Sequence, residues 1–203
     1  MSRALTAKNI FEKKYKLFEF LGEWKEAFDC PEKYGVWFIW GNSGNGKTTF
    51  VLKLIKYLTQ FDEVLLNSLE EGSSHTLKKG FVRVGMGEVS SKVLIVSEPI
   101  ERLEKRLNAK KSPGIVVIDS FQYFQLTYKQ YISFKEKYPK KLLIFISHAD
   151  GRSPAGRSAR SVMYDATLKV WVEGYRAFSK GRYIGEKGDI TIWPEGAVKY
   201  WGE

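Results

Sequence analysis

WGNSGNGKTT, at residues 40–49, is a glycine-rich run that ends in a lysine and two threonines. It overlaps the end of the apolar run VWFIW at residues 36–40, and apolar residues recur at helical spacing after it, from Phe50 to Leu58. Its spacing matches the pattern G-x-x-x-x-G-K-[ST], in which a loop between a strand and a helix directs backbone N–H groups at phosphate oxygens. Glycines suit this loop because they let the chain turn tightly and approach a ligand closely. The run therefore predicts a phosphate-binding loop.

The loop predicts contacts to ATP and Mg²⁺. Lys47 is expected to reach the β- and γ-phosphates, and the Thr48 hydroxyl is expected to be a ligand of Mg²⁺. The residues predicted to surround the phosphates are consecutive in the chain: Gly41, Asn42, Ser43, Gly44, Asn45, Gly46, Lys47, Thr48 and Thr49.

Strands and helices are predicted to alternate on either side of this loop. Apolar runs too short for a helix and rich in β-branched residues lie at residues 36–40, 64–69, 93–97, 114–120 and 142–147. Helix-like segments separate several of these runs. One follows the loop, one begins near the capping residue Ser97, and one begins near the capping residue Thr127. The alternation predicts an α/β fold whose mainly parallel sheet is flanked by helices on both faces.

The two ends of the chain depart from this alternation. From about residue 165 the sequence predicts strands without intervening helices, at residues 166–174, 176–184, 189–194 and 197–201, which form a C-terminal antiparallel extension of the sheet. Residues 1–33 are expected to form an N-terminal helical segment, and residues 34–203 the ATPase domain. The segment packs either on its own domain or on a neighbouring subunit, and both alternatives stay open.

Composition favours a polyanionic partner. The 203 residues include 33 lysines and arginines against 23 aspartates and glutamates, a formal net charge of +10, which permits nucleic-acid binding without establishing it. Cys30 is the only cysteine, so the chain has no disulfide framework and no four-cysteine zinc site. No apolar run approaches the ~18 residues of a membrane span. A cytoplasmic protein that does not enter a membrane is expected.

Carboxylates after two of the predicted strands are expected to complete the chemistry. The run IVVIDS places Asp119 at the end of an apolar strand, where a carboxylate can hold the water shell of Mg²⁺. Ser120 rather than an acid follows it, so the base that activates an attacking water must come from elsewhere. Glu70 and Glu71, in NSLEEG, end the second predicted strand beside the glycine loop. We predict that Glu70 is this base, and Glu71 is the alternative.

Over about residues 34–190 the chain resembles the RecA-like ATPases. NSLEEG resembles the segment of DnaB-type replicative helicases whose glutamate activates water, and this matches Glu70. VVIDSFQ is similar to the corresponding segment of RecA and of the bacterial RadA (Sms) proteins, with Asp119 and Gln122 at matching positions. SHADGRSPAGR and VMYDATLKVWVEG look like the RadA segment that runs from a phosphate-sensing strand end through a DNA-binding loop. The resemblance implies a RecA-like P-loop NTPase fold.

The resemblance also implies an assembly and further site residues. Family members stack as rings or filaments with ATP between subunits, so a homo-oligomer is implied in which a neighbour supplies positive charge to the γ-phosphate. Lys180 and Arg182, in SKGRY, fall near that place, and a solvated charge pair on a hairpin is the alternative. His148 lies where the family keeps a polar residue that senses the γ-phosphate, and a structural histidine is the alternative.

The chain departs from its relatives in what surrounds the core. It lacks the zinc module and the protease-like domain of RadA, and it has no room for the collar domain of the helicases. A reduced motor core of the kind that a phage or mobile element encodes is expected.

Three arginines occupy the segment ADGRSPAGRSARS, at residues 149–161. Its small residues predict a mobile loop that can wrap a phosphate backbone, and its place after the sensor strand matches the family's DNA-binding loop. The predicted nucleic-acid contacts are Arg152, Arg157 and Arg160. A solvated surface loop is the alternative.

The function predicted from these features is an ATP-hydrolysing motor, or a recombination or replication factor, that acts on single-stranded DNA as an oligomer. Two other classes share the glycine loop: nucleotide or small-molecule kinases, and regulatory P-loop ATPases that act on protein partners. An arginine-rich lid segment, as kinases carry between late helices, is not found in the sequence.

Overall fold

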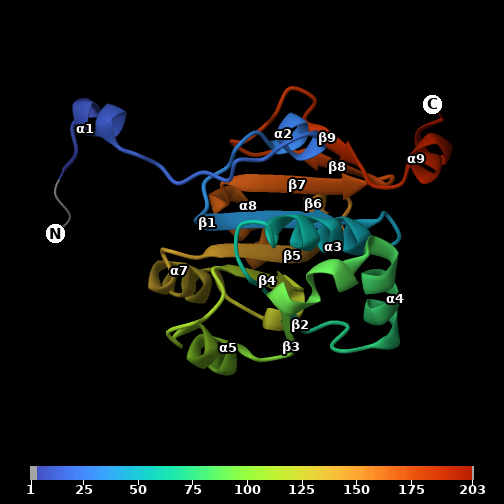
Figure 1. Cartoon of the computed structure of the whole chain (residues 1–203), viewed down its shortest axis with the longest axis horizontal. Helices are drawn as coiled ribbons and strands as arrows, with labels where there is room; N and C mark the ends of the chain where they lie inside the picture. The colour runs from blue at the N-terminus through green and yellow to red at the C-terminus, as the bar shows by residue number, and fades with distance from the viewer. Residues whose placement is uncertain (1–3, 203) are drawn as a thin grey trace.

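The structure, a computed structural model, describes residues 4–202 of the chain. Within these residues one sheet contains nine strands, and helices cover both of its faces (Figure 1). The strands are β1 (Gly35–Gly41), β2 (Val64–Ser68), β3 (Val93–Val96), β4 (Ile115–Asp119), β5 (Leu142–Asp150), β6 (Ser153–Pro154), β7 (Leu168–Glu173), β8 (Arg176–Ser179) and β9 (Asp189–Thr191). The helices are α1 (Ala7–Glu12), α2 (Glu23–Phe28), α3 (Lys47–Leu58), α4 (His75–Val84), the 3₁₀ helix η1 (Met86–Lys92), α5 (Ile100–Leu107), α6 (Phe121–Phe124), α7 (Tyr128–Lys137), α8 (Arg157–Asp165) and α9 (Pro194–Trp201).

The strand order is β3-β2-β4-β5-β1-β7-β8-β9, with β6 paired to β5. The strands from β3 to β7 are parallel, and β8 and β9 continue the sheet in antiparallel pairing. This confirms the predicted mainly parallel sheet with an antiparallel extension. Because β1 lies between β5 and β7, Gly41 is level with His148 on one side and with Val172 on the other. The carboxyl ends of the central strands therefore meet at one edge of the sheet, where ligands of open α/β sheets bind.

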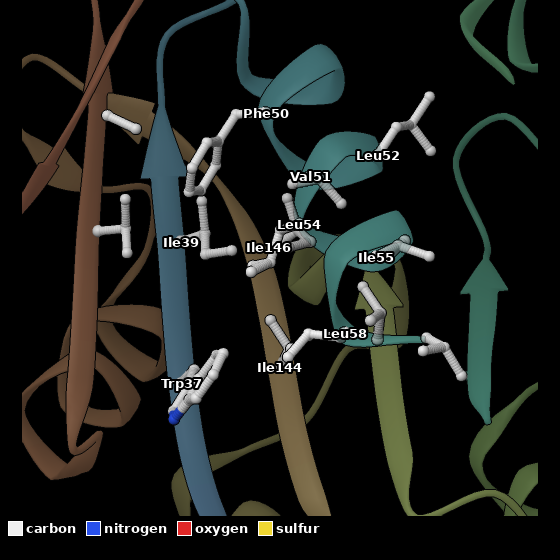
Figure 2. Close-up of a cluster of buried hydrophobic side chains, with 14 of the residues drawn as sticks. Trp37, Ile39, Phe50, Val51, Leu52, Leu54, Ile55, Leu58, Ile144 and Ile146 are labelled. Carbon is white, nitrogen blue, oxygen red and sulfur yellow. The ribbon is translucent and has the colours of Figure 1, made fainter. Parts of the chain in front are cut away.

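The core has two halves, one on each face of the sheet. Residues of β1 alternate between them, so that Trp37 and Ile39 face α3 while Phe38 and Trp40 face the other side. Figure 2 shows the first half, in which apolar side chains of α3 point toward Trp37 and Ile39 and toward β5. Helices α5 to α8 cover the second half. Burial on both faces explains why β1 reads as one continuous apolar run.

The C-terminal residues correct one prediction. Residues 197–201, predicted as a strand, belong to the helix α9. Pro194, taken as part of a turn, is the first helical residue, where its fixed φ and missing N–H cost nothing. A Cβ on Gly196 would lie 2.2 Å from the Trp193 ring, so this glycine lets the helix start against the indole. A five-residue apolar run cannot distinguish such a helix from a strand.

Two helices near the predicted site had no signal in the sequence. α4 contains Gly80, whose missing Cβ leaves room for the Leu52 side chain of α3, so this glycine serves helix packing. α8 begins directly after Gly156 and contains residues that were predicted to form part of a mobile loop. Thr127 caps α7 as expected, whereas Pro99 rather than Ser97 precedes α5.

Part of the N-terminal segment is built into the core of the sheet domain. α1 has no buried residue and stands apart from the sheet in Figure 1. The chain that follows it buries Phe18 and Phe20 to 2% exposure or less, and Phe20 packs on Trp37 of β1 and on Tyr57 of α3. Residues 1–3 of the predicted segment lie outside the described residues.

Two phenylalanines of this segment should therefore differ in their effect on stability. Phe20→Ala should lower the free energy of unfolding by about 3–5 kcal/mol, because it removes a buried ring from the core. Phe11→Ala, at a ring that is 89% exposed in α1, should change it by less than about 0.5 kcal/mol. Urea unfolding of the two variants measures the difference. Equal effects would contradict the packing described for Phe20.

Candidate nucleotide-binding site

The glycine loop connects β1 to α3 and has the backbone geometry of a phosphate cradle. Gly44 and Gly46 have φ angles of 77° and 91°, a region that costs other residues conformational energy. A Cβ on Gly41 would approach the Val172 carbonyl oxygen to 2.4 Å, so β1 and β7 can pair this closely only with glycine here. Gly46 caps the 12-residue helix α3 without a side-chain acceptor, which leaves the first N–H groups of that helix directed at the loop.

Asparagine side chains fix the loop to its surroundings. Asn45 accepts a hydrogen bond of 2.8 Å from the Gly174 N–H at its side-chain oxygen, and its carbonyl accepts one of 3.2 Å from the Tyr175 N–H. Asn42 donates to the Gly151 carbonyl oxygen at 3.1 Å. The loop is thus held between the turn that follows β7 and the turn that follows β5.

A cleft of about 760 Å³ opens at this loop. Its size is within the usual range for small-molecule sites. The structure brings together on its walls Lys47, Thr48, Thr49, Glu70, Glu71 and His148. The loop residues Asn42, Ser43, Gly44 and Gly46 also line it. The side chain of Asn45 is instead turned toward Ser43 and Gly174.

Asp119 lies at the end of β4, level with Ser68 of β2. Burial raises the pKa of its carboxyl to about 6, because a buried carboxylate loses hydration; the nearby Lys47 cation opposes this rise, and the Glu70 and Glu71 carboxylates add to it. Since a positive charge favours the ionised form, Asp119 is suited to lie near a bound cation.

The residues present fit Mg²⁺ bound together with a nucleotide. Residues 4–202 contain no group of three or more histidine, cysteine, aspartate or glutamate side chains that could hold a metal alone. Mg²⁺ usually takes one or two protein ligands, several waters and substrate phosphates, which suits the pair Thr48 and Asp119. Beside Asp119, the hydroxyls of Ser68 and Ser120 are buried without a hydrogen-bond partner among the described residues, so polar groups remain for ordered water.

Hydrogen bonds link Glu70 to the ends of β4 and β5 and to the segment that follows β5. Its carboxylate lies 2.9 Å from Nε2 of His148, and its N–H donates to the Asp119 carbonyl oxygen at 3.2 Å. The His148 N–H donates to the Gln122 side-chain oxygen at 3.1 Å, and the His148 carbonyl oxygen accepts from the Ala155 N–H at 2.9 Å. Gln122 also donates to the Ala155 carbonyl oxygen at 3.0 Å. Hydrogen bonds therefore connect Glu70 continuously to the arginine-bearing segment.

The Glu71 carboxylate contacts α4 rather than His148. Its carboxylate accepts a hydrogen bond of 2.9 Å from the Thr76 hydroxyl at the start of α4. The two glutamates line the same cleft, but the Glu71 carboxylate is bonded to Thr76 at the start of α4, whereas the Glu70 carboxylate contacts His148.

The cleft contains residues that sequence reasoning missed. Arg83 of α4 donates to the Thr49 hydroxyl at 3.0 Å, and no sequence signal points to it because α4 was not predicted. Tyr175 and Trp193 form an aromatic wall with their rings 4.9 Å apart, and Trp193 is 49% exposed. Lys53 fixes this wall by donating to the Ile192 carbonyl oxygen at 2.9 Å. Tyr175 follows Glu173, the last residue of β7, and Gly174. This Glu-Gly pair was the one feature of the sequence that pointed to a turn near the cleft.

Lys180, Arg182 and the three predicted arginines lie outside the cleft, and Gly41, Asn45 and Asp119 are also not among the residues of its walls. Lys180 and Arg182 follow β8, where their N–H groups donate to the carbonyl oxygens of Lys169 and Thr167 near the start of β7. Arg152 lies in the turn between β5 and β6, and Arg157 and Arg160 lie in the first turn of α8. All three arginines are exposed. The predicted mobile loop is instead a short hairpin followed by a helix.

No protein-family model matches the chain, and no curated protein matches it either. No helix within residues 4–202 has the length and apolar character needed to cross a membrane.

Three solved structures resemble this fold. The flagellar accessory protein FlaH from Methanocaldococcus jannaschii is 12% identical, with a TM-score of 0.60 over 86% of this chain and 91% of that chain. A KaiC-like protein from Pyrococcus horikoshii OT3 is 16% identical, with a TM-score of 0.59 over 86% and 97%. The third is the ATPase domain of another protein, 17% identical, with a TM-score of 0.56 over 81% and 84%. At these identities the likeness is one of fold, and it confirms the RecA-like P-loop fold.

The aromatic wall predicts how the cleft distinguishes its ligands. Trp193→Ala should weaken ATP binding about tenfold, because stacking one base on an aromatic ring is worth roughly 1–3 kcal/mol. Binding of tripolyphosphate, which has no base, should stay unchanged. Calorimetric titration with both compounds measures this, and Trp193→Phe is the matched control that keeps an aromatic ring. Equal losses for both compounds would show that the variant damages the cleft as a whole.

Proposed function

We propose that this protein is an ATPase that binds single-stranded nucleic acid as a homo-oligomer and couples ATP hydrolysis to its hold on the strand. The observation that carries the proposal is the hydrogen-bonded path from Glu70 through His148 to the segment that bears Arg152, Arg157 and Arg160. A change in the charge or position of Glu70 can therefore alter the position of His148 and, through it, of that segment.

Several residues predicted from the sequence receive a role in this proposal. Lys47 and the N–H groups of the loop bind the triphosphate, and Thr48 and Asp119 would hold Mg²⁺, which would neutralise part of the phosphate charge. Glu70 accepts a proton from the water that attacks the γ-phosphorus, so that the bond to ADP breaks as the new P–O bond forms. His148, already bonded to Glu70, detects whether the γ-phosphate is in place.

The two glutamates should separate in kinetics. Glu70→Gln should keep ATP binding and lower turnover by about 10²-fold or more, the usual effect of losing a general base. Glu71→Gln, at the carboxylate bonded to Thr76, should lower turnover by less than about tenfold. Phosphate release and nucleotide affinity are measured for both variants. A larger loss of turnover in Glu71→Gln than in Glu70→Gln would show that Glu71 is the base.

Charge at the start of α8 supports an anionic partner. Arg157 and Arg160 occupy the first turn of this helix, which contains no acidic residue. Cations are unfavourable at a helix N-terminus because the helix dipole is positive there, by about 0.3–1 kcal/mol each. None of the three arginines makes an ion pair with another residue within residues 4–202. A bound phosphate backbone would satisfy the guanidinium groups and the helix N–H groups together.

Assembly of several subunits would complete the cleft. Lys180 and Arg182 lie away from the cleft of their own chain, as residues that act on a neighbour's γ-phosphate would. Such a finger makes hydrolysis depend on stacking of subunits. This role is part of the proposal.

A regulatory ATPase that acts on a protein partner is the second candidate. One structure that shares the fold is a flagellar accessory protein, and the exposed helix α1, with Phe11 on its surface, offers an apolar contact to a protein here. Turnover that ignores oligonucleotides would favour this candidate, and phosphate transfer to an added acceptor would instead indicate a kinase.

Oligonucleotide binding tests the first candidate. Single-stranded oligothymidylate should stimulate phosphate release, and replacing the three arginines by glutamine should abolish the stimulation. The slope of log affinity on log salt should become shallower by about 0.7 per lost phosphate contact, or about 2 for three contacts.

The matched control replaces three exposed lysines of α5 and of the turn that follows it, and carries the same change in charge: Lys105→Gln, Lys110→Gln and Lys111→Gln. Light scattering of the same samples measures whether ATP and oligonucleotide raise the particle mass. An unchanged rate and an unchanged salt slope in the arginine variant would overturn the proposed role of the segment.

A further inference from the structure

A second cavity, of about 520 Å³, is lined by Trp40 and Trp171, which lie on the face of the sheet opposite α3. Its walls include Trp40 of β1, Trp171 of β7, Phe178 of β8 and Trp201 of α9, and we call it the aromatic pocket. Trp40 and Trp171 are nearly buried and form its floor, with ring centroids 5.6 Å apart. Trp201 is 38% exposed and stands edge-on to Phe178 at 6.0 Å, which makes it the accessible wall.

The polar atoms of these indoles are already paired. Trp40 donates to the Arg152 carbonyl oxygen at 3.0 Å, Trp171 donates to the Glu173 carboxylate at 3.0 Å, and Trp201 donates to the Gly174 carbonyl oxygen at 3.1 Å. The pocket therefore offers a ligand ring faces rather than free N–H donors. Such a surface suits a flat aromatic group that stacks.

Cations surround the pocket. Arg152, Lys169 and Lys180 line it, and within residues 4–202 none of them makes an ion pair. Among the described residues Glu173 is the one acidic member of the wall, and its carboxylate already accepts hydrogen bonds from Trp171 and, at 3.4 Å, from the Tyr200 hydroxyl. The ammonium groups of Lys169 and Lys180 lie 5.9 and 5.8 Å from the Tyr164 and Phe178 rings.

We propose that the aromatic pocket takes an unpaired nucleobase of a single-stranded nucleic acid, with the adjoining phosphates beside Arg152 and Lys169. Stacking rings bordered by cations are the combination that binds single strands without sequence preference. A protruding peptide side chain could use the rings but would leave the cations without partners. The inference rests on the proposed function, and it names the place where the strand is held by its bases.

The pocket and the nucleotide cleft share one wall. Glu173 lines the pocket, Tyr175 lines the cleft, and Gly174 lies between them. Gly174 donates to Asn45 of the phosphate-binding loop and accepts from Trp201 of the pocket. A base in the pocket and a nucleotide in the cleft therefore act on the same turn, and each should change the affinity for the other by an equal factor.

The experiment compares two strands with the same number of phosphates, on the full chain with ATP present. One is an oligothymidylate of about 16 nucleotides, the upper end of single-strand site sizes, and the other carries abasic sites throughout. Fluorescence anisotropy should show that the abasic strand binds about tenfold more weakly or worse. Trp201→Ala should weaken the ordinary strand about tenfold and leave the abasic strand nearly unchanged, so the difference between the strands should shrink or vanish. An oligouridylate arm shows whether the base is held in DNA, in RNA or in both.

Further variants separate stacking from other effects. Trp201→Phe should keep most of the affinity for the ordinary strand, because it keeps a ring on which a base can stack. It removes the hydrogen bond to Gly174, so it also tests whether that bond matters. Lys169→Gln should weaken both strands by the same factor, as a phosphate contact would. Phe11→Ala and Lys111→Gln, at exposed positions distant from the pocket, should leave both affinities unchanged. A far-ultraviolet circular dichroism spectrum like that of the unaltered protein shows that the Trp201→Ala protein is folded.

Each other outcome has a definite meaning. Equal affinity for the two strands, together with no effect of Trp201→Ala, overturns the base pocket while the proposed function stands. No binding of any strand by protein that binds ATP overturns both. A change of particle mass in Trp201→Ala without a change in strand affinity identifies the pocket as a protein contact and overturns the inference.

Discussion

The close pairing of β1 with β7 is the constraint on which the candidate site depends. At Gly41 the two backbones approach so closely that a single methyl group would collide with the Val172 carbonyl oxygen. This approach places the turn after β7 beside the phosphate-binding loop, where Asn45 bonds to Gly174 and Tyr175. The position of the loop, the aromatic wall of the cleft and one wall of the aromatic pocket all follow from it.

Local signals in the sequence were enough for the centre of the sheet. Continuous apolar runs predicted the central strands because those strands are buried on both faces, and the glycine spacing predicted the loop because its backbone conformation needs glycine. The ends of the chain were harder because their structure is decided by tertiary contacts. α9 follows from how Pro194 and Gly196 meet the Trp193 ring, and Phe20 is buried only because Trp37 and Tyr57 lie opposite it. Arg83 and Trp193 reach the cleft from elements distant in the sequence, which periodicity cannot bring together.

Two routes lead from the nucleotide cleft to surface cations that form no ion pair within the described part of the chain. One passes through Glu70, His148 and Ala155 to the arginine-bearing segment, and the other passes through Asn45, Gly174 and Trp201 to the aromatic pocket. Both routes end near Arg152, because this residue lies in the arginine-bearing segment and also lines the aromatic pocket. A strand held at both places would be sensitive to the γ-phosphate and to the position of the phosphate-binding loop. Each route combines hydrogen bonds with short stretches of the covalent chain.

The charges around Asp119 bear on the proposed binding of a triphosphate together with Mg²⁺. Burial makes the ionised form of Asp119 costly, and the neighbouring Glu70 and Glu71 carboxylates increase that cost, while Lys47 offsets only part of it. A triphosphate alone would add negative charge and attract Lys47, which would leave Asp119 still less stable as a carboxylate. A divalent cation held by Thr48 and Asp119 would reverse the balance, because a nearby positive charge favours the ionised form of Asp119. In the proposed function the site would therefore bind a nucleotide together with its metal more tightly than it binds either component alone.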